Sequence, residues 1–218
     1  MSQNNLLGSW NIINIKYNYS KNINIFLESQ LRSLSFYDNF HYYEIKGEIG
    51  YKIEPHVKFS VGCGTHQTFR EGGNFRLPKN NSEFRLWPQV TLYQKWNKLR
   101  LDHRYRYEMR WTSSGFRNRF RLRPTLTYSF GPRMNENYLF FISLSNELFF
   151  TNTAPYFERN RTQTVLGIKP FRFMSFQTGY VFQFDYKIND EIGRDFLLIG
   201  IFYEISNISN TFKSKKSN

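Results

Sequence analysis

The sequence predicts an all-β protein, folded as a single antiparallel transmembrane β-barrel of about 10 to 12 strands with short periplasmic turns and longer extracellular loops. Three observations favour this fold. Apolar and polar side chains alternate with period two over most of the chain, 19% of the residues are aromatic, and the mean hydropathy is only −0.59. No window approaches the roughly 18 consecutive apolar residues that would cross a bilayer as a helix.

The alternating segments follow one another along the whole chain, and we count about eleven of them, a spacing typical of membrane barrels. Period two places successive side chains on opposite faces of a sheet, so each segment is a candidate strand. In order, the segments run from Ile13 to Tyr19, Ile23 to Arg32, Tyr43 to Ile53, Val57 to Gln67, Glu83 to Tyr93, Leu99 to Trp111, Arg117 to Tyr128, Tyr138 to Thr151, Arg161 to Lys169, Met174 to Tyr186 and Phe196 to Ile205.

The alternation is clearest in the segment from Leu99 to Trp111. One face carries leucine, tyrosine, methionine and tryptophan, and the other is almost entirely charged. The next segment repeats this design, with four arginines on one face and Phe120, Leu122 and Leu126 on the other. His103 lies on the apolar face, where we expect it only near a rim.

A soluble β-sandwich also alternates apolar and polar residues, so it is the main alternative. The segments here are about ten to fifteen residues long, whereas strands of soluble proteins usually have five or six. In hydrocarbon an open sheet edge would leave backbone groups unpaired, so such strands would have to close into a barrel.

The expected connections differ between the two ends of the strands. Short turns are expected at one end, and longer polar loops at the other are typical of extracellular loops. The expected turns are 20–22, 54–56, 94–98, 131–137 and 169–172, and the expected loops are 70–81, 112–116, 151–159 and 187–194.

The strand count conflicts with one rule of bacterial barrels. Both termini in the periplasm require an even number of strands, and eleven is odd. Either the first segment is not a strand, or it lies partly inside the lumen.

We divide the chain into an N-terminal segment 1–9, a barrel over 10–205, and a polar, disordered C-terminal tail 206–218. The start has neither a basic nor an apolar leader region, so a signal peptide is expected to have been removed. The expected location is a bacterial outer membrane, with outer-membrane lipid and lipopolysaccharide as partners and an unidentified membrane protein as a further one.

If the aromatic faces meet lipid, the charged faces line the lumen, and arginine predominates among them. The expected lumen charges are Glu28, Arg32, Glu83, Arg85, Arg100, Asp102, Arg104, Arg106, Glu108, Arg110, Arg117, Arg119, Arg121, Arg123, Glu147 and Arg161. Arginine makes forked pairs with carboxylates, so these rows could cross-link a structural plug or scaffold. The surplus of arginine could instead create a narrow anion-preferring pore.

An outer-membrane lipid hydrolase is the alternative function, with His66 meeting Ser113 or Ser114 at a rim. No third catalytic group can be identified, so we assign no catalytic residues. The four histidines lack the spacing of a zinc site, and no glycine-rich loop opens a helix, so neither a metal nor a cofactor is expected. The net charge of +13 could indicate nucleic acid, but enclosed arginines would not reach it.

Five stretches together resemble an uncharacterised family of bacterial outer-membrane β-barrels, domain-of-unknown-function family 2490. They are 83–89 (EFRLWPQ), 99–111, 117–124, 145–149 (SNELF) and 158–161 (ERNR). The resemblance covers most of the chain and implies a fold and a location. That family has no established activity, so the resemblance supplies no catalytic residues.

Overall fold

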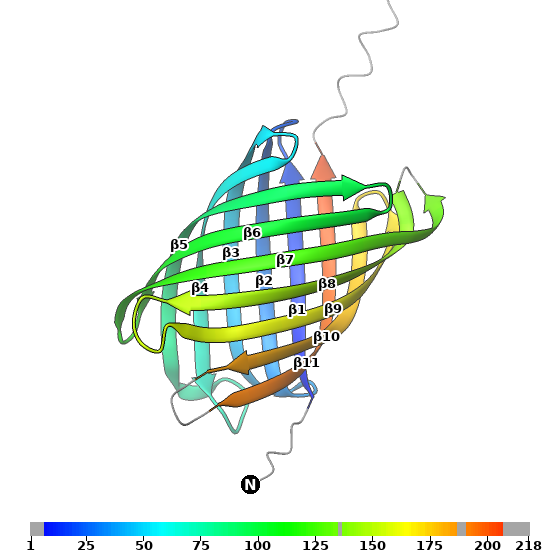
Figure 1. Cartoon of the computed structure of the whole chain (residues 1–218). Helices are drawn as coiled ribbons and strands as arrows, with labels where there is room; N and C mark the ends of the chain where they lie inside the picture. The colour runs from blue at the N-terminus through cyan, green and yellow to red at the C-terminus, as the bar shows by residue number, and fades with distance from the viewer. Residues whose placement is uncertain (1–6, 135–136, 187–190, 207–218) are drawn as a thin grey trace, which may run out of the picture.

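A computed structural model describes residues 7–134, 137–186 and 191–206, which form a closed β-barrel of eleven strands (Figure 1). The strands are β1 (Gly8–Asn18), β2 (Ile23–Ser35), β3 (Asp38–Glu54), β4 (Val57–Arg70), β5 (Arg76–Trp96), β6 (Leu99–Thr112), β7 (Gly115–Met134), β8 (Asn137–Thr151), β9 (Phe157–Phe171), β10 (Met174–Asp185) and β11 (Ile192–Ser206). Most of the expected segment 1–9 and of the expected tail 206–218 lies outside the described residues. The described residues include no helix long and apolar enough to cross a membrane.

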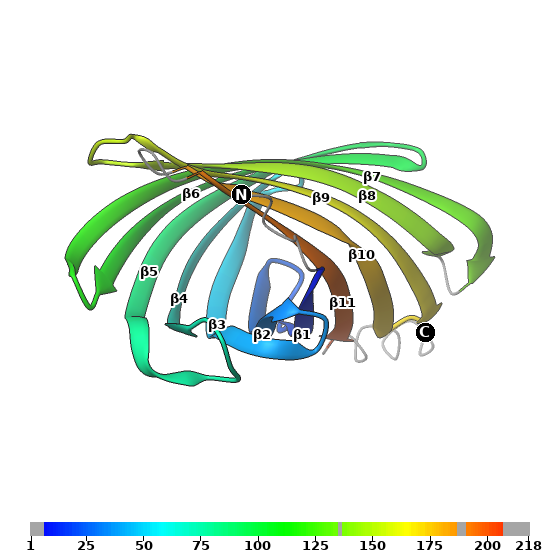
Figure 2. The same cartoon turned by 90° about the horizontal axis from the view of Figure 1, so that it is seen from below.

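The barrel closes between its first and last strands, which run parallel. Every strand pairs with its neighbours in sequence, and all of those pairs are antiparallel. β1 and β11 then pair in parallel from Gly8 opposite Phe196 to Asn18 opposite Ser206. Both arrows point the same way in Figure 1 and lie side by side in Figure 2.

This closure corrects two expectations. The barrel is not wholly antiparallel, because an odd number of alternating strands brings two strands of the same direction together at the seam. The first segment is also neither a mistaken strand nor a lumen segment, since β1 is a full member of the wall. Gly8 and Ser206 consequently lie at opposite rims.

We call the two ends of the barrel the turn rim and the loop rim. The turn rim carries the connections 19–22, 55–56, 97–98 and 172–173, and the loop rim carries 36–37, 71–75, 113–114 and 152–156. Two expected loops are wrong in extent. Residues 76–81 belong to β5 and pair with β4 through two register shifts, and 112–116 is a two-residue turn.

The barrel reverses the usual distribution of side chains between inside and outside. Among the described residues, forty large apolar side chains are exposed, whereas 24 polar or charged residues and nine hydrophobic ones are buried. Outward positions on β6 include Tyr105, Tyr107 and Trp111, which are exposed, while Arg106 and Glu108 between them are buried. His103 occupies an outward position opposite Pro124 and Leu92.

Glycines let large rings lie flat against the inner wall. A Cβ on Gly62 would lie 2.5 Å from the Trp87 ring, which is fully buried across the β4–β5 pair. A Cβ on Gly8 would meet the Phe196 ring at 2.7 Å in the same way across the β1–β11 seam. The absent side chains at these positions therefore create room for aromatic packing inside the barrel.

Candidate functional site: the charged lumen

The sixteen charged residues expected in the lumen all belong to the inward-facing rows of their strands. Twelve of them line a central cavity: Glu28, Arg32, Arg85, Arg104, Arg106, Glu108, Arg110, Arg119, Arg121, Arg123, Glu147 and Arg161. Arg100 and Asp102 line a cavity at the turn rim, and Arg117 lines one at the loop rim. Glu83 is buried and pairs with Arg85, which lines the central cavity.

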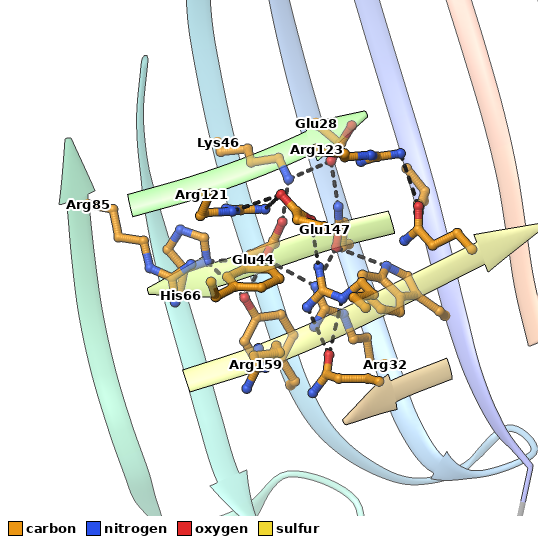
Figure 3. Close-up of a pocket in the computed structure, with 18 of the residues that line it drawn as sticks. Glu28, Arg32, Glu44, Lys46, His66, Arg85, Arg121, Arg123, Glu147 and Arg159 are labelled. Carbon is orange, nitrogen blue, oxygen red and sulfur yellow. Dashed lines mark hydrogen bonds and ion pairs between the residues drawn. The ribbon is translucent and has the colours of Figure 1, made fainter. Parts of the chain in front are cut away.

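Two fully buried carboxylates organise the middle of the lumen. Glu108 accepts hydrogen bonds from Arg119 at 2.6 and 2.9 Å and from Arg121 at 2.5 Å. Glu147 accepts two from Arg121, at 2.7 and 2.9 Å, and one from Arg104. Arg121 of β7 therefore joins β6 to β8, and Figure 3 shows the Arg121 and Glu147 side chains pointing toward each other.

A second group of ion pairs lies nearer the loop rim. Glu83 binds Arg85 through two 2.8 Å hydrogen bonds and also accepts from Arg110. Arg110 and Arg119 both reach Glu158 on β9, at 3.2 and 2.9 Å. These contacts connect β5, β6 and β7 with β9, so they extend well beyond pairs of neighbouring strands.

A third group occupies the wall made by β2, β3 and β4. Glu44 pairs with Lys46 at 2.5 Å, with His66 at 3.1 Å and with Arg32 at 3.4 Å, and it also accepts from the Tyr42 hydroxyl. Lys46 additionally binds Glu28 at 2.6 Å. Each of these charges is thus balanced locally, as buried charges must be.

Guanidinium groups also stack on aromatic rings inside the barrel. Arg32 lies 3.4 Å and Arg161 lies 4.6 Å from the centroid of the Trp10 ring. Phe149 has four guanidinium groups within 5.6 Å of its centroid: Arg119, Arg121, Arg159 and Arg161. Such contacts allow cations to be buried against a partner other than a carboxylate.

Three cavities follow one another through the lumen. The central one measures about 420 Å³, the one at the turn rim about 500 Å³ and the one at the loop rim about 550 Å³. The central cavity shares Gln177 and Phe202 with the turn-rim cavity. It shares four residues with the loop-rim cavity: Arg110, Glu158, Arg159 and Arg194.

The charges that line these cavities do not cancel. Twelve cationic side chains and five carboxylates line the central cavity, an excess of seven positive charges. Four carboxylates that do not line the central cavity, Glu48, Glu71, Glu83 and Asp185, pair with lining residues and reduce that excess to three. At the turn rim, seven cations face two carboxylates, Asp102 and Glu204.

Comparison with known protein families gives one match. The family described as "Protein of unknown function (DUF2490)" matches residues 7–193, which spans nearly all of the barrel. The chain belongs to this family. Comparison with curated proteins and with solved structures gave no match.

Several residues of the DUF2490 barrel's charged interior are not among the sixteen expected from sequence. Glu44, Lys46 and Glu48 alternate with apolar residues on β3, so period two could have identified them. Glu158 and Arg159 fall in an expected loop. Arg159 continues the alternation of Arg161 and Gln163, so period two could have identified it, whereas Glu158 lies at a bulge between β8 and β9 that sequence does not signal.

The proposed Ser and His pair of a lipid hydrolase is not brought together. The imidazole of His66 is buried in the lumen and contacts Tyr42 and Glu44. The Ser113 hydroxyl, in a loop-rim turn, bonds backbone groups of Ser82. No cluster of three potential metal ligands occurs within 7–134, 137–186 and 191–206.

Proposed function

We propose that this DUF2490 protein is a bacterial outer-membrane β-barrel whose lumen forms a narrow, anion-preferring path. The apolar outer surface supports the membrane location, because a soluble monomer rarely exposes an apolar patch of more than a few hundred Å². Here every one of the eleven strands carries at least one exposed large apolar side chain, and Trp96 and Trp111 are among them. The membrane would cover this surface.

The observation that carries the proposed path is the excess of positive charge along the central and turn-rim cavities. A chain of cavities lined by fixed cations lowers the energy of an anion and raises that of a cation. The network of ion pairs holds the wall rigid, so the charges stay in place when an ion enters. The path would be narrow, since Gln177 and Phe202 lie where the central and turn-rim cavities meet.

The orientation that we propose places the turn rim in the periplasm and the loop rim outside, according to the usual difference in connection length. Outer-membrane lipid would then contact the apolar wall, and lipopolysaccharide would contact the loop rim.

Planar-bilayer recording tests the path directly. We expect steady single-channel current whose reversal potential in a KCl gradient shows preference for chloride. Lys95→Gln combined with Lys169→Gln removes two cations from the turn-rim cavity and should reduce that preference. Lys21→Gln, in an exposed turn outside the cavities, is the control that should leave it unchanged.

A structural scaffold is the second candidate, and the cross-lumen ion pairs of Glu108, Glu147 and Glu158 favour it. A barrel that is inserted, as judged by protease protection in vesicles, but passes no current would support the scaffold and remove the pore.

A further inference from the structure

The central cavity has two chemically different walls. The wall formed by β2 to β8 is rich in arginine and glutamate, as described above. The opposite wall presents apolar residues of β1, β9 and β11 to the same cavity, namely Trp10, Ile12, Val165, Leu198 and Phe202; the charged residues of β9 and β11, Glu158, Arg159, Arg161 and Arg194, lie nearer the loop rim. Trp10, Val165 and Leu198 also belong to a buried apolar cluster with Val181 and Phe196.

Arg123 lies where these two walls meet. Its guanidinium donates to Gln163 Oε1 at 3.0 Å. Gln163 is paired with Val181 across the β9–β10 ladder and is two residues from Val165 on the same face of β9. The cationic head of Arg123 is therefore held beside the apolar wall. Figure 3 shows Arg123 among the charged side chains of the cavity.

Arg123 also differs from the other arginines of the central cavity in its partners. Each of the other ten has a carboxylate oxygen within 4.0 Å, whereas no carboxylate of the described residues lies that close to Arg123. A charge in such an enclosed site is costly unless an ion of opposite sign joins it. The Arg123 guanidinium therefore has no counter-ion among the described residues.

We propose that the central cavity binds an organic anion whose phosphate or carboxylate group pairs with Arg123 and whose apolar body packs on Val165, Leu198 and Phe202. A guanidinium can bind either type of anionic group through two parallel hydrogen bonds. The volume of about 420 Å³ falls in the range of small-molecule sites, about 300–1,000 Å³. This inference rests on the proposed function, since it names the class of anion that the lumen accepts.

Calorimetric titration of the full chain in nanodiscs of zwitterionic lipid tests the site with three probes. Phenyl phosphate carries both features, inorganic phosphate carries only the charge, and phenol carries only the ring. We expect phenyl phosphate to bind at least about tenfold more tightly than inorganic phosphate, because its ring buries apolar surface against the wall, and we expect phenol not to bind. Equal affinity for both phosphates, or no binding of either, would overturn the proposal.

Two variants assign the binding to this site. Arg123→Gln should weaken phenyl phosphate binding by about tenfold or more, the effect of losing a charged hydrogen-bond donor. No carboxylate of the described residues loses an ion-pair partner in Arg123→Gln, so the ion-pair network stays intact. Arg76→Gln, an exposed residue at the loop rim, removes the same charge elsewhere and should have no effect. If Arg123→Gln binds like the unmodified chain, the site is not at Arg123.

Val165→Thr tests the apolar wall at nearly constant side-chain volume. It should weaken phenyl phosphate binding and leave inorganic phosphate binding unchanged. The three-probe comparison on the unmodified chain decides the proposal even if a variant fails to fold. Binding of phenyl phosphate without conductance would contradict the pore and support the anion site. Conductance without binding would support the pore and contradict the anion site.

Discussion

The carboxylate of Glu108 has no exposed surface, and three arginines, Arg106, Arg119 and Arg121, hold it in place. Removal of one member of a buried ionic group leaves the others as unpaired buried charges, which costs about 3–5 kcal/mol. Glu108→Gln should therefore lower the free energy of unfolding by about this amount. Urea-induced unfolding from lipid vesicles, followed by tryptophan fluorescence, measures it.

Asp102→Asn is the matched control for that prediction. Asp102 pairs with Arg100 at 2.7 Å, but the Arg100 side chain is 50% exposed. An exposed ion pair contributes about 0–1 kcal/mol, so this variant should unfold at nearly the same urea concentration as the unmodified chain. Equal losses for both variants would contradict the role that we assign to burial.

Residue-level alternation explains why so much of the lumen could be predicted. On β6, and on β7 from Arg117 to Arg123, every second residue is charged, and period two alone assigns those side chains to one face. The apolar wall gives no such signal, because Phe196, Leu197, Leu198 and Ile199 are apolar on both faces of β11. The unpaired state of Arg123 is likewise invisible in sequence, since it depends on contacts between distant strands.

At the scale of elements, the β1–β11 seam is the feature that sequence could not supply. Strand segments are local patterns, whereas closure depends on how the first and last strands meet. Bacterial barrels usually have an even number of strands, which favoured an even number here. The parallel pairing of β1 with β11 instead lets an odd number of strands close the barrel, because it satisfies the backbone groups of both edge strands.

The seam makes a geometric prediction about cross-linking. Ile13 and Ile201 are directly opposite each other and both are exposed on the outer face. In a Cys63→Ser background, Ile13→Cys with Ile201→Cys should form a disulfide under mild oxidation, because directly paired strand residues approach the Cβ separation of about 3.5–4.5 Å that a disulfide needs. The product is detected by its mobility in non-reducing gel electrophoresis.

Ile13→Cys with Leu197→Cys is the control pair. Leu197 lies four positions before Ile201, the residue opposite Ile13, and faces the same side of the sheet. It is about 13 Å from Ile201 along the strand. A cross-link in this pair, or its absence in the directly opposite pair, would show that the barrel does not close in the parallel register.

Across the whole molecule, apolar and charged side chains are distributed in the reverse of the order found in a soluble protein. Apolar rings and aliphatic groups cover the outside, and arginine and glutamate fill the inside. In hydrocarbon such a wall must be closed, and the eleven-strand ring closes it. The proposed membrane location, the anion path and the anion-binding site all require the outer face of the barrel to contact lipid.

Cys63 provides the most direct test of that claim. It is the single cysteine of the chain, it is exposed, and it lies on the outer face near the middle of β4. An environment-sensitive fluorophore attached there, in protein reconstituted into vesicles, should be quenched by nitroxide groups on lipid acyl chains and protected from aqueous iodide. The same fluorophore at Ser143→Cys in a Cys63→Ser background, facing the turn-rim cavity, should show the reverse. Quenching at Cys63 by iodide and not by lipid nitroxide would contradict the account.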